Sequence, residues 1–127
     1  MHASLTVFFH IPKTQQTEII EDVENSSRQE SGYIIMDVRN MDEIAQTGKL
    51  SPCVESLPLP YIAQMNAFGM SAEDFEEQFG FEKPELDETL VFSCKAGIRS
   101  MQAAQLAAMN GYTNIVNYKG GAMDWFR

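Results

Sequence analysis

Residues 89–100 read TLVFSCKAGIRS, and this stretch decides the fold class. It opens with a short apolar run ending at Ser93, which predicts a buried strand. A loop of small residues then leads into a helix that begins near Ser100, is rich in Ala, Met, Leu and Gln, and ends before Gly111. A buried strand followed at once by a helix is the repeating unit of parallel α/β sheets.

The same alternation continues toward both ends of the chain. The unbroken apolar run at 33–38 is typical of a strand covered on both faces. Residues 26–32 are expected to break the chain, and Pro58 and Pro60 to keep it extended. We expect strands at 4–9, 33–38, 54–57, 89–93 and 115–118, and helices at 18–26, 41–46, 72–79, 100–110 and 122–126. The pattern predicts an α/β fold with a mainly parallel sheet, in one domain over residues 1–127.

Composition and charge exclude several classes of protein. The 127 residues are 44% hydrophobic, enough for one compact core, and the net charge of -9 argues against a nucleic-acid binder. Two Cys and two His make neither a disulfide framework nor an easy zinc site, so no metal and no cofactor are expected. Because neither a membrane-spanning run nor a signal peptide is visible, we expect a cytoplasmic protein that contacts no membrane. We also expect a monomer.

The charge is distributed unevenly along the chain. Residues 1–88 hold 17 acidic and five basic side chains, whereas residues 89–127 hold one acidic and four basic ones. A site in the last third should therefore prefer a small anion. Chance clustering on solvated faces is the alternative explanation.

Cys94 is the strongest candidate for a reactive group. It directly follows the predicted strand, and three effects favour its thiolate at neutral pH. The helix beginning near Arg99 directs unpaired N–H groups toward it, Gly97 permits a turn whose amides face one anion, and Lys95 and Arg99 add positive charge. The alternative is an inert buried thiol, since free Cys is among the most buried residue types. The position between strand and helix favours the reactive one.

The chemistry expected of this thiolate is attack on sulfur. A Cys–His hydrolase needs a histidine base, and the two candidates, His2 and His10, both lie near the start of the chain. No nucleophile elbow or Gly-rich phosphate loop is present. A thiolate without a proton-shuttling partner suits a substrate whose electrophile is another sulfur atom.

Four segments, in order, resemble the single-domain rhodaneses of the thiosulfate sulfurtransferase family. They are YIIMDVR at 33–39, CKAGIRS at 94–100, NGY at 110–112 and GGAMDW at 120–125, and the resemblance is strongest over residues 14–127. It implies a five-stranded, mainly parallel sheet flanked by helices on both faces. It also implies that the thiolate takes a sulfane sulfur from thiosulfate, becomes a persulfide and passes that sulfur to a thiophilic acceptor.

Residue roles follow from the resemblance position by position. Cys94 would be the nucleophile, and Lys95 and Arg99 would hold the sulfite end of thiosulfate. Asp37 and Arg39 would support the active loop. The alternative is that Asp37 only forms a turn at the end of a strand and that Arg39 is a surface cation. The acceptor stays open among cyanide, glutathione, thioredoxin and a protein thiol. The loop amides expected to cradle the transferred sulfur are those of Lys95, Ala96, Gly97, Ile98, Arg99 and Ser100, while Gly120, Gly121 and Trp125 are expected to shape and pack the last turn.

Two other functions remain as alternatives. A catalytically silent rhodanese-like module would bind a partner, although such modules often lack the cysteine. A related Cys-dependent phosphatase is less favoured because its loop has one residue more than the six of 94–99. Cys53 has two interpretations, a thiol that resolves an oxidised Cys94 or a passive one.

Overall fold

Five strands form one sheet in the computed structural model, which describes residues 9–127. Their order is β1-β5-β4-β2-β3, and every neighbouring pair is parallel. The predicted α/β fold with a five-stranded sheet is therefore confirmed. The predicted strand at 4–9 lies outside the described residues except for Phe9. The strands are β1 (Phe9–Ile11), β2 (Tyr33–Asp37), β3 (Glu55–Ser56), β4 (Thr89–Ser93) and β5 (Ile115–Tyr118).

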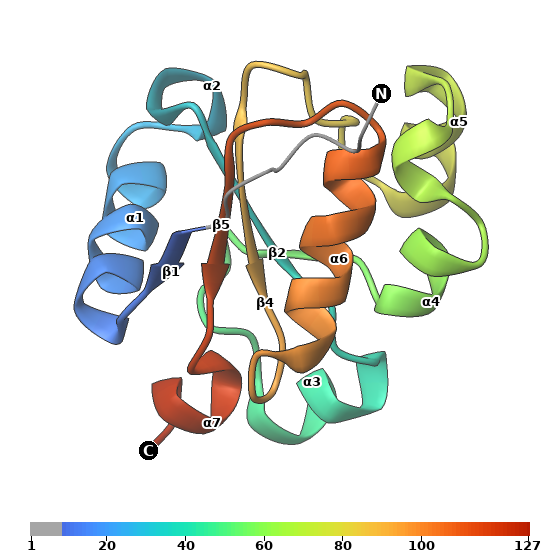
Figure 1. Cartoon of the computed structure of the whole chain (residues 1–127). Coiled ribbons are helices and arrows are strands. Elements are labelled where there is room, and N and C mark those ends of the chain that lie inside the picture. Colours follow the sequence, from blue (N-terminus) through green and yellow to red (C-terminus); the bar gives the residue numbers. More distant parts are fainter. Residues whose placement is uncertain (1–8) are drawn as a thin grey trace.

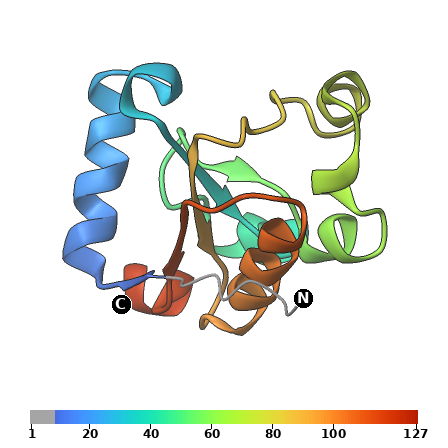
Figure 2. The same ribbon diagram turned by 45° about the horizontal axis from the view of Figure 1, so that its top comes forward.

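Helices cover both faces of the sheet. Helix α1 lies on one face, and α4, α5 and α6 lie on the other (Figures 1 and 2). No helix within residues 9–127 is long and apolar enough to cross a lipid bilayer. The helices are α1 (Lys13–Asn25), α2 (Arg28–Ser31), α3 (Met41–Thr47), α4 (Leu59–Ala63), the 3₁₀ turn η1 (Ala67–Gly69), α5 (Ala72–Phe79), α6 (Ile98–Met109) and α7 (Gly121–Trp125).

The two faces bury two separate apolar clusters. Side chains alternate along β4, so Leu90 and Phe92 pack under α6 while Val91 packs under α1. Ala residues of α6 let that helix approach the sheet closely, and Ile19 and Ile20 of α1 fill the other face. This two-sided burial explains why the strands are apolar without alternation.

The largest differences from the sequence-based expectation concern three helices. Helix α1 begins at Lys13, directly after Pro12, rather than at residue 18. The expected break at 26–32 contains the short helix α2, with the Ser27 side chain accepting a hydrogen bond from the Glu30 N–H. Helix α4 includes Pro60, because the first turn of a helix does not need the N–H that proline lacks.

The carboxyl ends of the strands meet at one edge of the sheet, and this edge positions the candidate site. Asp37, Ser93 and Tyr118 are register partners at the ends of β2, β4 and β5. The Val38 N–H donates to the Ser93 carbonyl at 2.8 Å and extends the pairing by one residue. Helices α3 and α7 and the loop between β4 and α6 gather at this edge (Figure 1). Ligands of open α/β sheets bind at such an edge.

Candidate active site at the end of strand β4

Cys94 lies at the floor of the loop between β4 and α6. Its Sγ accepts a hydrogen bond from the Gly97 backbone N–H at 3.0 Å, and the Ser100 hydroxyl oxygen is 3.3 Å from the same sulfur. Cys94 is 1% exposed. A substrate must therefore reach the sulfur past the exposed loop residues Lys95 and Ala96.

Gly97 gives this loop its shape. Its φ of +93° lies in the left-handed region, and a Cβ atom on it would come within 2.5 Å of the Lys119 carbonyl oxygen. Only glycine avoids both the strain and this collision. Gly97 is also the N-cap of α6, a helix of 12 residues, so the positive end of the helix dipole faces the sulfur. The local sequence thus places a hydrogen-bond donor and a dipole against Cys94.

The two cations of the loop have different surroundings. The Lys95 side chain is exposed, and its ammonium has no hydrogen-bond or ion-pair partner among residues 9–127. The Arg99 guanidinium donates two hydrogen bonds to Glu43, at 2.6 and 2.8 Å, across from α3. Because Glu43 neutralises most of the Arg99 charge, Lys95 supplies most of the positive charge that a bound anion would meet. Ile98, the first residue of α6, is 75% exposed, and its side chain is apolar.

Glu43 is held in its ionised form by these contacts. Its hydrogen bonds with the Arg99 guanidinium, followed by one from the Asn40 N–H, lower the pKa of Glu43 from 4.5 to about 2, although burial opposes this. The same pair raises the pKa of Arg99. Glu43 also completes a capping box with Asn40 at the start of α3. One carboxylate therefore ties the start of α3 to the active loop.

The lowered pKa predicts how acid affects the fold. A carboxyl group with a depressed folded-state pKa stabilises the protein above its unfolded value of 4.5, and this contribution is lost as the pH falls through about 2. We expect Glu43→Gln to lower the unfolding free energy at pH 7 by about 1 kcal/mol or less, since the pair is partly exposed. In urea titrations, the difference from wild type should shrink as the pH falls from 4.5 and vanish below about 2. A constant difference across this range would contradict the prediction.

Asp37 and Arg39 form a buried ion pair beside the loop. The Arg39 Nε and Nη2 atoms donate to the Asp37 carboxylate at 2.8–3.1 Å, and the Arg39 backbone N–H donates to Asp37 Oδ1 at 3.0 Å. The Arg39 guanidinium also donates to the Thr47 hydroxyl and the Gly48 carbonyl. Arg39 is 2% exposed, so the alternative of a surface cation is wrong. The pair fixes the turn between β2 and α3.

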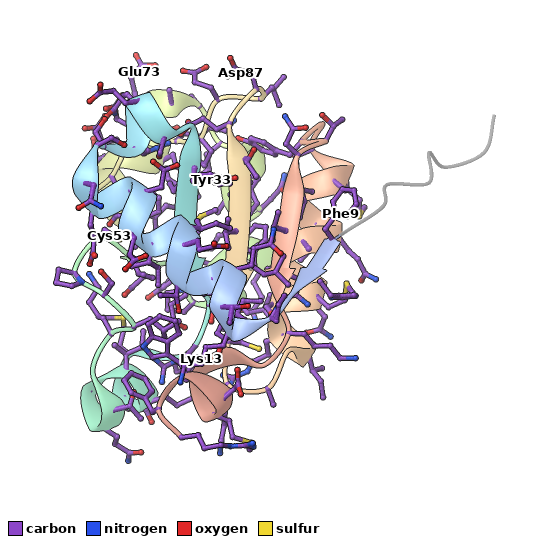
Figure 3. All side chains as sticks on the ribbon, turned by 90° about the vertical axis from the view of Figure 1, so that its left-hand side faces the viewer. Phe9, Lys13, Tyr33, Cys53, Glu73 and Asp87 are labelled. Carbon is purple, nitrogen blue, oxygen red and sulfur yellow. The ribbon has the colours of Figure 1, made fainter. Side chains whose placement is uncertain are left out.

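Cys53 lies too far from Cys94 to resolve an oxidised form of it. Cys53 packs with the cluster on the α1 face, whereas Cys94 belongs to the cluster on the opposite face. Figure 3 shows Cys53 on the flank of the molecule beside α1. It precedes β3, which lies two strand spacings of about 4.8 Å from β4. A disulfide needs Cα atoms within about 7 Å, so the passive interpretation fits this structure.

A hollow of about 270 Å³ adjoins Lys95 between α3 and α7. Gln46 contributes an amide to its wall, and Met123 and Phe126 contribute apolar surface. Neither this hollow nor the partnership of Glu43 with Arg99 was predicted from the sequence. The two members of that pair are 56 positions apart, and no local pattern links them.

Comparisons with known proteins agree with this architecture. Residues 18–127 match the rhodanese-like domain family. Human thiosulfate:glutathione sulfurtransferase is 38% identical over 92 residues, covering 72% of this chain and 76% of the human protein. A putative mitochondrial thiosulfate sulfurtransferase of Schizosaccharomyces pombe is 34% identical over 108 residues, covering 83% of this chain and 73% of that protein. The solved structure of the human single-domain sulfurtransferase TSTD1 matches with a TM-score of 0.74 and 30% identity, covering 92% of this chain and 94% of the human one.

The fold and the loop define an α/β domain with a cysteine at the carboxyl edge of its sheet. The chain belongs to the rhodanese-like domain family, as the sequence segments predicted. The name of the S. pombe relative places that protein in mitochondria, and a cytoplasmic location remains a prediction for this chain.

Proposed function

We propose that this protein is a thiosulfate sulfurtransferase that carries the transferred sulfur on Cys94. The observation that carries the proposal is the Gly97 N–H at 3.0 Å from Sγ, at the start of α6. A donor at that distance stabilises negative charge on the thiolate and on a persulfide formed from it. The names of relatives at 34–38% identity supply the donor, thiosulfate.

The reaction proceeds in two displacement steps. The Cys94 thiolate attacks the outer sulfur of thiosulfate, the S–S bond of thiosulfate breaks, and sulfite leaves with the electron pair. Lys95 binds the sulfonate oxygens of thiosulfate. The Arg99 N–H groups that do not bond to Glu43 donate further hydrogen bonds to them. The acceptor thiolate then attacks the terminal sulfur of the Cys94 persulfide. That S–S bond breaks, and the Cys94 thiolate is regenerated.

Glutathione is the acceptor that we propose. The human relative is named for transfer from thiosulfate to glutathione. In the hollow beside Lys95, the ammonium of that residue can bind a carboxylate of glutathione, and the Gln46 amide can bond to its peptide groups. Met123 and Phe126 provide apolar surface for its aliphatic segment. Cyanide, being small, needs none of these contacts and serves as the reference acceptor.

Intact-mass spectrometry tests both steps separately. Treatment with thiosulfate should add one sulfur atom, which peptide mapping assigns to Cys94. Glutathione should then remove that sulfur and yield glutathione persulfide. If no sulfur is added, the sulfurtransferase proposal is wrong and a silent binding module is favoured. If para-nitrophenyl phosphate is hydrolysed instead, and Cys94→Ser abolishes the hydrolysis, the phosphatase alternative replaces it.

The Glu43–Arg99 pair predicts a change in thiosulfate affinity. Glu43→Gln removes the carboxylate that neutralises Arg99, so a bound dianion meets more positive charge. We expect the KM for thiosulfate to fall by about threefold to tenfold at low ionic strength, and less at high salt. Asp42→Asn is the matched control, because it removes the same charge from the same helix at an exposed position. Equal KM changes in both variants would contradict a specific role for the pair.

A further inference from the structure

The first turn of α7 is hydrogen-bonded to the active loop. The Ala122 N–H donates to the Cys94 carbonyl at 2.8 Å, and the Met123 N–H donates to the Lys95 carbonyl at 3.0 Å. The first N–H groups of a helix have no partner within it, so both are available for these bonds. Figure 1 shows α7 beside the loop that leads into α6. Helix α7 thus binds two successive peptide groups of the loop through their carbonyl oxygens.

This outer contact determines where the inner amides point. A trans peptide group is planar, and its N–H points opposite to its carbonyl. Because α7 holds the carbonyls of Cys94 and Lys95, the N–H groups of Lys95 and Ala96 point away from α7. N–H groups directed in this way are available to an anion held in the loop, where the Gly97 N–H already meets Sγ.

Gly121 allows α7 to approach this closely. Its φ is +63°, and a Cβ atom on it would collide with the Cys94 carbonyl oxygen and lie 2.6 Å from that of Lys95. Both obstacles are backbone atoms of the active loop, so they cannot rotate aside as a flexible side chain would. Any side chain at 121 must therefore displace either α7 or the loop.

The outer end of α7 is anchored to two other elements. The Tyr118 hydroxyl at the end of β5 donates to Asp124 Oδ2 at 2.7 Å. The Lys13 ammonium at the start of α1 donates to the Trp125 carbonyl at 2.9 Å and lies 5.6 Å from the centre of the indole ring. Figure 3 shows Lys13 at the start of α1, near α7. Contacts with α1 and β5 therefore hold α7 in place.

We propose that Gly121 and the anchored first turn of α7 are positioning elements for catalysis. They hold the carbonyls of Cys94 and Lys95 outward, which directs the loop amides toward the sulfur and stabilises the anionic thiolate and persulfide. This inference rests on the proposed sulfur transfer but concerns residues that do not touch the substrate. It assigns a role in catalysis to Gly121, which the sequence assigned only to packing of the last turn.

Gly121→Ala tests the proposal against a matched glycine. Gly80→Ala is the control, because Gly80 has a φ of +83° and nothing within 4 Å of its would-be Cβ. Both changes impose left-handed strain, but only Gly121→Ala disturbs the loop. We expect Gly121→Ala to lower kcat by about tenfold to a hundredfold and to shorten the lifetime of the Cys94 persulfide, less than complete removal of one amide donor would, because the amides are misaligned and not lost. Gly80→Ala should leave both unchanged.

A second readout needs no sulfur donor. Peptide mapping after iodoacetamide treatment gives the alkylation rate of Cys94 separately from that of Cys53, and if the loop amides stabilise the thiolate this rate should fall in Gly121→Ala. If wild-type protein accepts no sulfur but Cys94 is alkylated faster in it than in Gly121→Ala, the proposed function is wrong and the positioning role is supported. A Gly121→Ala variant with wild-type alkylation and persulfide lifetime would overturn the positioning role, as would equal losses in Gly80→Ala.

Tyr118→Phe decides the question if Gly121→Ala does not fold. It removes only the hydrogen bond to Asp124 that anchors α7. We expect the persulfide lifetime to shorten by about threefold to tenfold, in line with the loss of one hydrogen bond. Asp124→Asn in otherwise wild-type protein keeps an acceptor oxygen for the Tyr118 hydroxyl and should retain most of the wild-type lifetime. A wild-type lifetime in Tyr118→Phe overturns the proposal.

Discussion

Cys94→Ser is expected to lower the rate of sulfur transfer from thiosulfate by at least about a thousandfold. A serine hydroxyl is not ionised near neutral pH, and its oxygen does not form the S–S bond that carries the transferred sulfur. The Gly97 N–H and the start of α6 would remain in place, but they would have no anion to stabilise. The variant should fold, because serine fits the volume of cysteine. Thiocyanate formation from thiosulfate and cyanide measures the loss.

Cys53→Ser provides the matched control for this experiment. Burial raises the pKa of the Cys53 thiol, which makes it less reactive, and it lies on the opposite face of the sheet from Cys94. We expect its activity to stay within about twofold of wild type, as for a substitution outside the site. If Cys53→Ser lost activity together with Cys94→Ser, two cysteines would share the reaction and the single-carrier scheme would be wrong.

The sequence identified the elements around the nucleophile because their signals are local. The run at 89–93, the glycine at 97 and the alanine-rich helix after it are neighbours in the chain, and each encodes its own conformation. Strand β2 was equally clear, since an apolar run without alternation is typical of two-sided burial. Hydrophobic pattern and glycine placement were enough to place Cys94 at the carboxyl edge of the sheet.

The parts that the sequence did not predict depend on contacts between distant segments. Arg99 looked like a free cation because Glu43, its partner, is one of 18 acidic residues with nothing to distinguish it. Gly121 looked like a turn residue because only the folded chain brings α7 against the Cys94 and Lys95 carbonyls. Helix α4 was missed because Pro60 was expected to keep the chain extended, although proline fits a first helical turn.

The Asp37–Arg39 pair predicts a large loss of stability. Both side chains are at most 2% exposed, so solvent cannot readily replace the partner of either charge. Removing one member of such a pair leaves the other charge buried and unpaired, which costs about 3–5 kcal/mol. We therefore expect Asp37→Ala to lower the unfolding free energy by that amount, measured by urea denaturation at pH 7. For a domain with about 5–15 kcal/mol of stability, this is a large fraction of the total.

A double-mutant cycle separates the pair from simple loss of packing. If the unpaired charge is the cause, Asp37→Ala with Arg39→Ala should cost less than the sum of the single variants, by about 1–3 kcal/mol. Arg28 and Glu88 form the comparison pair, with similar two-contact geometry but 17% and 15% exposure of their side chains. Truncating either should cost about 1 kcal/mol, because water can solvate the remaining charge. Additive losses at Asp37 and Arg39 would show that burial of the pair is not what makes the turn after β2 stable.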